Sequence, residues 1–420
     1  MSNSIVIVRS DNKIITALFH ERELVTIGIE AEEKKPRVGD IYIGRIRNIV
    51  KNINGAFVEI ADKEVCYLTL SENMSPVFCD GKERRSADEC KTDVANGVKG
   101  EKVLNSRPLR IGDELLVQIA KDTAKSKAPL ATADINLTGR YVVLVKGKST
   151  IGVSSKITVD SERDRLKNLV RAYLENDLGF IVRTNAVTAK DEDITAEIES
   201  LKEQYKTLTT KKVHGLCFTK VYSAPSSYIL EVRDGYSYEI DSIRTDDKEI
   251  YESLKEYMSL YSKEELKKLE LYEDKNISLS VLYGLEGKLQ KALSDKVWLD
   301  SGAYLVIQPT EALVSIDVNT GKAIAGKQNT EETFFKVNCE AAVEIAAQLR
   351  LRNLSGIIIV DFIDMKEEEH RKQLLALLKE EIAKDHITTR LIDMTPLGLV
   401  ELTRQRIRKP IHESDSYITR

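Results

Sequence analysis

Two apolar runs limit the possible folds of this chain more than any other feature of its sequence. An aspartate follows each run, and a helical pattern lies between them. The run ALVSI at 312–316 is followed by Asp317, and the run IIIV at 357–360 is followed by Asp361. Apolar residues between the runs recur at helical spacing. A strand, a helix and a strand in this order form a βαβ unit, whose two strands run parallel.

Parallel strands bring their carboxyl ends to one edge of a sheet, so Asp317 and Asp361 should lie about 5 Å apart if their strands are neighbours. Asn319 points the same way if the first strand continues that far. Close carboxylates repel each other unless a cation or a proton lies between them. Donors that are all oxygen atoms predict Mg²⁺ or Mn²⁺ rather than zinc.

Two other interpretations of these residues remain open from the sequence. The segment DVNTG suits a turn, and Asp364 suits the cap of a following helix. The segment GKAIAGKQ, from Gly321, fits most of a phosphate-binding loop, but Gln328 stands where Ser or Thr would hold magnesium. Nucleotide binding is therefore the weaker interpretation, and Gly321 and Gly326 would instead let a basic loop pass close to a phosphate backbone.

Composition sets broad limits. The 420 residues suffice for several domains, and a net charge of -4 neither suggests nor excludes a nucleic-acid partner. The cysteines are five in number and scattered, which favours a reducing compartment over a disulfide framework. No apolar run approaches the roughly 20 residues of a membrane span, and the N-terminus has no signal-peptide core, so we expect a cytoplasmic protein.

The pattern along the chain alternates between strand-rich and helical regions. Alternating apolar residues predict antiparallel strands over 1–35, and short strands with turns predict a small barrel over 37–133. Within that barrel, 72–108 lacks periodicity and predicts a long loop. Helices are expected near 161–176 and 191–210, strands over 215–245, and mainly helix over 246–297.

Several motifs resemble those of the ribonuclease E/G family of bacterial endoribonucleases. The strongest are PTEALVSIDVNTGK, EAAVEIAAQLRLRNLSGIIIVDFIDM and LGLVELTRQRIRKPIHES, and GDIYIGRI, LTGRYVVLV and GFIVRT add to them. They cover the whole chain in the family's order. The resemblance implies a multidomain, mixed α/β (α+β) fold: an RNase H-like part formed by 1–36 and 222–290, an S1-type OB barrel at 37–133, a 5′-sensor segment at 134–221 and a DNase I-like catalytic part at 291–420.

The resemblance also implies chemistry. The residues that match Asp317 and Asp361 bind a catalytic Mg²⁺ in the family, and the match of Asn319 supports it. The family cuts single-stranded, A/U-rich RNA in RNA processing and decay and leaves a 3′-hydroxyl and a 5′-phosphate. A metal on two carboxylates can activate water for such hydrolysis. No histidine pair suits metal-free acid–base catalysis, because His370 and His386 are expected to be surface residues.

Three further positions match RNA-contacting residues of the family. Phe57 and Tyr67 match aromatics on which bases stack, although a place in the barrel core is nearly as good an interpretation of Phe57. Lys127 matches a basic residue near bound RNA, but the segment AKSKAPL departs from the family's glycine-rich form.

Four positions match the residues that form the family's binding pocket for the 5′ end of RNA. Arg183 and Thr184 follow an apolar strand, and an arginine fork beside a hydroxyl suits a terminal phosphate. Gly139 and Val143 match the positions that complete the pocket, and a glycine there would allow close backbone approach. Without the resemblance, a surface salt bridge and a turn would be the better interpretation. With it, the expected partner is single-stranded RNA with a 5′-monophosphate.

One family feature is missing. Family members continue with a Cys-Pro-x-Cys pair that shares zinc between two subunits, whereas this sequence stops at Arg420 without a zinc-binding pair. Either the sequence is truncated at this end, or the protein forms a homodimer or a higher homo-oligomer in another way, or it does not oligomerise. The rival to an enzyme is an S1-type RNA-binding protein without catalysis, and the intact set of Asp317, Asn319 and Asp361 argues against it.

Overall fold

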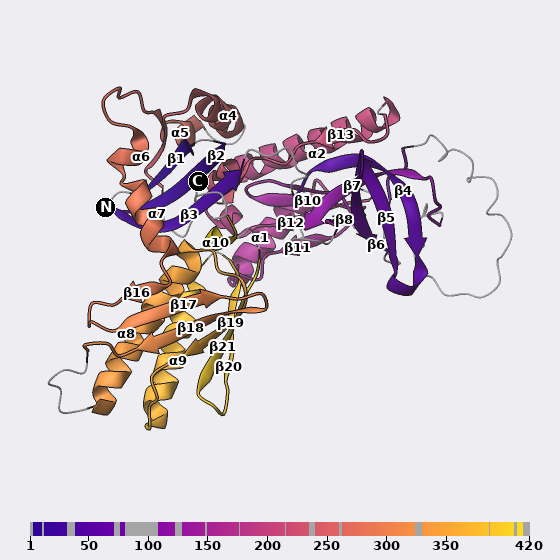
Figure 1. Cartoon of the computed structure of the whole chain (residues 1–420). Coiled ribbons are helices and arrows are strands. Elements are labelled where there is room, and N and C mark those ends of the chain that lie inside the picture. Colours follow the sequence, from indigo (N-terminus) through magenta and orange to yellow (C-terminus); the bar gives the residue numbers. More distant parts are fainter. Residues whose placement is uncertain are drawn as a thin grey trace. The chain divides into compact units, whose positions relative to one another are not determined.

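The computed structural model describes residues 3–10, 12–31, 38–70, 76–79, 108–121, 128–147, 149–175, 177–214, 216–234, 240–259, 263–323, 330–385, 387–406 and 410–414. The chain forms two compact units. One unit combines Met1–Glu32, Ser227–Ser259 and Lys263–Arg420, and the other combines Glu33–Ser226 with Leu260–Ser262. Both contain sheets and helices, so the expected mixed α/β class is confirmed (Figure 1).

The first sheet of unit one has the strand order β15-β14-β1-β2-β3. Its strands are β1 (Asn3–Ser10), β2 (Lys13–His20), β3 (Glu23–Ala31), β14 (Ser242–Thr245) and β15 (Leu269–Leu271). The hairpins β1–β2–β3 are antiparallel as expected, and β14 and β15 join in parallel. The helices around it are α3 (Ser227–Asp234), α4 (Lys248–Ser259), α5 (Lys263–Leu266), α6 (Leu279–Leu282) and α7 (Leu285–Leu293). Alternate residues of β1 enter two different cores, so the strand is buried on both faces.

The second sheet of unit one carries the aspartates and has the order β16-β17-β18-β19-β21-β20. Its strands are β16 (Lys296–Trp298), β17 (Tyr304–Pro309), β18 (Leu313–Asn319), β19 (Gly356–Asp361), β20 (Thr389–Met394) and β21 (Leu399–Arg404). The crossover α8 (Thr330–Leu351) and α9 (Glu368–Ala383) pack together on one face of this sheet, and the short α10 (Ile411–Ser414) follows (Figure 1). As the crossover predicts, β18 and β19 pair in parallel.

A barrel forms the first part of unit two. Its strands follow the order β13-β4-β5-β6-β8-β7, and a further pairing of β4 with β7 closes the ring. They are β4 (Ile41–Val50), β5 (Gly55–Ala61), β6 (Glu64–Thr69), β7 (Glu114–Lys121), β8 (Leu130–Thr132) and β13 (Lys220–Tyr222). The expected small barrel is therefore present. Of the loop expected at 72–108, most lies outside the described residues.

The other sheet of unit two has the order β11-β12-β10-β9. It consists of β9 (Asn136–Thr138), β10 (Val142–Lys146), β11 (Ile151–Val153) and β12 (Leu178–Val182). Two helices, α1 (Asp160–Arg171) and α2 (Asp191–His214), share its apolar core. Both occur where the sequence predicts helices, although α1 ends five residues before the expected 176.

One expectation of secondary structure is wrong. The sequence predicts strands throughout 215–245, but Ser227–Asp234 is helix α3. Tyr228, Ile229 and Val232 recur at helical spacing and pack into the core beneath the first sheet, so tertiary packing overrides their strand propensity. Among the described residues, no helix is long and apolar enough to cross a membrane.

Candidate active site

The two aspartates lie side by side on adjacent strands. Asp317 of β18 and Asp361, the last residue of β19, are direct register partners in the parallel pair. Neighbouring strands lie about 4.8 Å apart, so both carboxylates share one small area. Both side chains are exposed, whereas Ile316 and Val360 beside them point to the other face and are buried under the helices. The alternation of the strands thus presents the carboxylates on the open face of the sheet.

The third residue of the set is also in place. Strand β18 continues through Asn319, so this side chain points the same way as Asp317, and its Nδ2 donates to Oδ2 of Asp317 at 2.6 Å. Asp317 is therefore a strand residue and not the turn residue of the alternative interpretation. Asp364 does not cap α9, because the cap position of that helix is Glu367.

The electrostatics of this edge favour a cation. Partial burial raises the pKa of the Asp361 carboxyl above its ordinary value, and the negative charges of Asp317 and Asp364 raise it further. Part of the cost of keeping Asp361 ionised is thus repulsion from its neighbours. A divalent cation between the carboxylates would remove that repulsion.

The donor set fits magnesium. In the parts of the chain that the structure describes, no group of three or more His, Cys, Asp or Glu side chains is placed to hold a metal ion. The candidate metal ligands are therefore the two carboxylates of Asp317 and Asp361, and the carboxamide of Asn319 lies beside them. Mg²⁺ is commonly held by one or two carboxylates and completes its shell with water and substrate phosphate, which is the arrangement these residues allow.

The barrel aromatics face each other outside the barrel core. Phe57 of β5 and Tyr67 of β6 are register partners, and their ring centroids lie 5.8 Å apart in an edge-to-face arrangement. Both are half-buried, and neither belongs to the core cluster, which takes the alternate residues Ala56 and Val58 of β5. The core interpretation of Phe57 is therefore wrong.

The Tyr67 ring is held in position by two features of the hairpin. Its hydroxyl donates to the carbonyl of Ile53 at 2.7 Å. A Cβ on Gly55 would lie 2.2 Å from the ring, so only glycine allows this approach. Lys127, the other expected RNA contact of the barrel, lies outside the described residues.

The four residues that are expected to bind the 5′ end of RNA lie on or next to one sheet of unit two. Arg183 follows β12, and its Nη1 donates to the carbonyl of Gly139 at 2.7 Å. Val143 of β10 is paired with Ile181, two residues before Arg183. The Thr184 hydroxyl lies 3.2 Å from that of Ser154, a residue that the sequence did not single out.

A second residue that sequence reasoning missed is Glu197 of α2, which is only 3% exposed. Its carboxylate accepts from the backbone N–H of Tyr141 at 3.0 Å and of Val142 at 3.2 Å. Burial raises the pKa of this carboxyl, while these hydrogen bonds and the charge of Arg183 oppose the rise. A Cβ on Gly139 would lie 1.7 Å from the Glu197 carboxylate, so glycine is required where this turn meets α2.

The expectation that His370 is a surface residue is wrong. Its side chain on α9 is 15% exposed, and the ring stacks on Phe335 of α8 with centroids 4.3 Å apart. Its nitrogens lie 3.5 Å from Glu331 and 3.4 Å from Glu367. His370 therefore fixes α9 against α8, and His386 lies outside the described residues.

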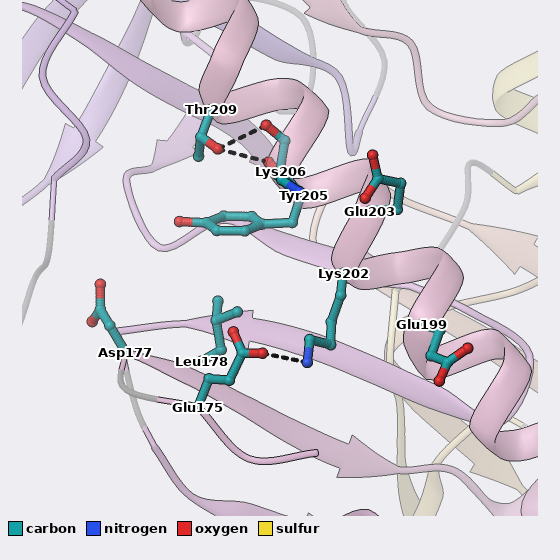
Figure 2. Close-up of a pocket in the computed structure, with 9 residues that line it drawn as sticks. All are labelled: Glu175, Asp177, Leu178, Glu199, Lys202, Glu203, Tyr205, Lys206 and Thr209. Atoms are coloured by element: carbon teal, nitrogen blue, oxygen red, sulfur yellow. Dashed lines mark hydrogen bonds and ion pairs between the residues drawn. The ribbon is translucent and has the colours of Figure 1, made fainter.

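A pocket in unit two lies between α2 and the turn that precedes β12 (Figure 2). Four carboxylates line it against two lysines: Glu175, Asp177, Glu199 and Glu203, with Lys202 and Lys206. Lys202 is already paired with Glu175. The excess of negative charge disfavours an RNA backbone, so this pocket is a poor candidate for the site.

Comparison with known proteins agrees with these observations. The model of the ribonuclease E/G family matches residues 136–407. Ribonuclease G of Salmonella typhimurium is 38% identical over 388 residues, which are 92% of this chain and 76% of that protein. Ribonuclease G of Haemophilus influenzae is 36% identical over 401 residues, or 95% of this chain and 79% of that protein.

Ribonuclease E of Synechocystis is 31% identical over 410 residues, which are 97% of this chain but 57% of that longer protein. Sequence similarity of this extent, shared with several relatives over most of this chain, defines the class. The chain belongs to the ribonuclease E/G family. It is an endoribonuclease.

Proposed function

We propose that this endoribonuclease is Mg²⁺-dependent, cuts single-stranded, A/U-rich RNA and leaves a 3′-hydroxyl and a 5′-phosphate, in the processing and decay of rRNA and mRNA. The observation that carries the proposal is the register pairing of Asp317 with Asp361 on the open face of the sheet, with Asn319 bonded to Asp317. The substrate preference rests on membership of the family.

The roles of the three residues follow from their positions. Asp317 and Asp361 would hold the metal, which when bound lowers the pKa of water and stabilises negative charge on the phosphodiester. Asn319 orients the Asp317 carboxylate through its hydrogen bond. The sheet supplies rigidity, because both aspartates belong to hydrogen-bonded strands whose other face is packed against α8 and α9.

The finer architecture is part of the same proposal. The first sheet of unit one corresponds to an RNase H-like part, and the sheet that carries the aspartates corresponds to a DNase I-like part. The barrel is of the S1 type, and Phe57 and Tyr67 stack on RNA bases. A cytoplasmic location suits an enzyme that acts on RNA and has scattered free cysteines.

In the sensor segment, Arg183 and Thr184 would receive a 5′-monophosphate, with Gly139 and Val143 completing the pocket. The hydrogen bond from Arg183 to the Gly139 carbonyl supports this, because it fixes the guanidinium beside the turn that Glu197 holds. A monophosphate should accelerate cleavage relative to a 5′-hydroxyl or the bulkier triphosphate, and Arg183→Ala should erase that preference. Equal rates on all three 5′ ends in the unmodified protein would reject the sensor without affecting the metal site.

The test of the activity is incubation with a 5′-monophosphorylated, A/U-rich single strand, with and without Mg²⁺, followed by analysis of the product ends. We expect cleavage only with Mg²⁺ and fragments with 3′-hydroxyl and 5′-phosphate ends. Cleavage that persists in excess chelator, or 2′,3′-cyclic phosphate ends, would contradict metal-assisted hydrolysis. Binding without any cleavage would favour the non-catalytic RNA-binding alternative.

A further inference from the structure

An exposed cluster of two aromatic rings and a lysine lies on the sheet that carries the aspartates. Trp298, the single tryptophan of the chain, is 59% exposed on the edge strand β16. Its ring centroid lies 5.1 Å from that of Tyr304 on β17, in a tilted arrangement. The Lys296 ammonium lies 4.2 Å from the Trp298 centroid and 3.5 Å from the Tyr304 centroid.

Strand register joins this cluster to the candidate active site. Trp298 is paired with Tyr304, and Tyr304 is paired in turn with Asn319. Directly paired residues point to the same face of a sheet, so the cluster and the carboxylates share the open face. Two strand spacings, about 10 Å, separate the Trp298 backbone from that of Asn319.

The chemistry of the cluster suits a nucleotide. A tryptophan left more than half exposed presents a large apolar surface to water, and such rings contribute strongly when a partner covers them. Any nucleobase has a π-face that can stack on such a ring without sequence preference. Among the described residues no ion pair joins Lys296 to a carboxylate, so its charge remains available to a phosphate.

The placement of the lysine adds a second argument. The two aspartates make the neighbouring part of the face acidic, which repels the phosphates of an approaching strand. A cation held on aromatic rings at the edge of this area offsets that repulsion and does not neutralise the carboxylates directly. The cluster therefore combines a stacking surface and a cation on the same face as the carboxylates.

We propose that Lys296, Trp298 and Tyr304 form a nucleotide subsite of the active-site face. One base of the single-stranded substrate stacks on Trp298, Tyr304 supports that ring, and Lys296 contacts the phosphate that flanks the base. The subsite positions the strand so that the adjacent phosphodiester reaches Asp317 and Asp361. It rests on the proposed function, because its ligand is the RNA which that function requires.

The single tryptophan allows a direct test of binding that does not depend on cleavage. The Asp317→Asn variant is titrated with an unlabelled A/U-rich single strand while tryptophan emission is recorded, and a labelled copy of the strand gives the affinity by anisotropy. We expect saturable quenching of the emission with the same midpoint as the anisotropy. RNA binding that leaves the emission unchanged would overturn the proposal, whether or not the unmodified enzyme cuts RNA.

Steady-state cleavage by variants tests the role in positioning. Loss of one stacked base should raise the KM of Trp298→Ala about 5- to 150-fold. Trp298→Phe should recover most of that loss, because phenylalanine also offers a π-face. Ile392→Ala is the matched control, since Ile392 is 54% exposed on β20 at the opposite edge of the same sheet.

Lys296→Gln should flatten the slope of log affinity against log salt by about 0.7, as expected for one lost phosphate contact to a single strand. An unchanged KM in Trp298→Ala with a lowered melting temperature would show that the cluster only stabilises the sheet edge, which would overturn the subsite. If the unmodified chain cuts no RNA, the proposed function fails, and the tryptophan titration still decides whether RNA reaches the cluster.

Discussion

At the scale of single residues, the contact between Gly139 and Glu197 is the least tolerant point near the proposed 5′ sensor. A methyl group on Gly139 would lie 1.7 Å from the Glu197 carboxylate, which is buried and holds two backbone N–H groups. Gly139→Ala should displace that carboxylate and cost about 1–3 kcal/mol in the free energy of unfolding. The preference for a 5′-monophosphate should fall with it, because the same turn carries the carbonyl that binds Arg183.

Denaturant unfolding measures this loss, and Gly287→Ala provides the control. Gly287 lies in helix α7, and a Cβ there meets no atom within 4 Å. Alanine should be neutral or should stabilise the helix by about 1 kcal/mol. Equal stability of the Gly139→Ala variant and the unmodified protein would show that the turn yields to the added methyl.

Tyr67 gives a second prediction at this scale. The ring lies outside the barrel core, so Tyr67→Ala should leave the melting temperature nearly unchanged. Affinity for single-stranded RNA should weaken by about 1–3 kcal/mol, the contribution of one stacked base. Fluorescence anisotropy with a labelled strand measures it. A large loss of stability with unchanged affinity would instead assign Tyr67 a structural role.

At the scale of elements, the start of helix α4 should make the first sheet sensitive to acid. Asp247 accepts from the backbone N–H of Ile250 at 3.0 Å and from Arg9 of β1 at 2.5 Å. Burial raises the pKa of Asp247, but the hydrogen bonds from Arg9 and Ile250 and the charge of Arg9 outweigh it, so the net pKa is lowered from 3.8.

A carboxyl whose pKa is lowered by folding stabilises the fold above its unfolded pKa and loses that contribution as the pH falls through the folded value. Asp247→Asn keeps a capping side chain but removes the charge, so it should cost about 1 kcal/mol at neutral pH. The difference from the unmodified protein should vanish as the pH falls below 3.8. Urea unfolding across pH measures this, with Glu249→Gln as control, since Glu249 also contacts Arg9 but is 86% exposed. A difference that persists at low pH would contradict the charge interaction.

The secondary-structure elements also show how much of the fold and of the candidate site could be predicted from the sequence. Strands β18 and β19 and the helix between them follow from apolar periodicity, and the crossover makes the two strands parallel, so Asp317 and Asp361 are predicted at the same edge of the sheet. That β18 and β19 are direct neighbours with Asp317 opposite Asp361 comes from the structure. Helix α3 was missed because its β-branched and aromatic residues favour a strand when considered alone. Glu197 carried a weak signal, a carboxylate next to Ile198 on an apolar helix face, but its backbone partners lie more than 50 positions earlier in the sequence.

The cluster of Lys296, Trp298 and Tyr304 could likewise not be predicted from the sequence alone. Trp298 and Tyr304 are neighbours only because β16 and β17 form a hairpin with one particular register. A shift of that register by one residue would turn Trp298 to the other face. Periodicity therefore predicts elements and their order, whereas a site assembled from separate strands requires the pairing itself.

At the scale of the whole molecule, the proposed metal ligands and the proposed RNA contacts of the barrel and the sensor segment fall in different compact units. Asp317, Asn319 and Asp361 belong to unit one, whereas Phe57, Tyr67 and the sensor residues belong to unit two. Each unit has its own apolar cores. Loss of a carboxylate should therefore abolish turnover and leave the proposed RNA contacts of the other unit intact.

Single-turnover cleavage and RNA affinity, measured together on Asp317→Asn and Asp361→Asn, test the proposed metal site most directly. The substitutions keep shape and remove charge, and Asp393→Asn is the control because Asp393 is exposed on β20 of the same sheet. We expect each of the two variants to bind RNA with unchanged affinity and to cut it at least about a thousandfold more slowly than the unmodified protein. Asp393→Asn should cut RNA at the unmodified rate. Cleavage by Asp317→Asn at the unmodified rate in Mg²⁺ would contradict the assignment of this pair as the catalytic centre.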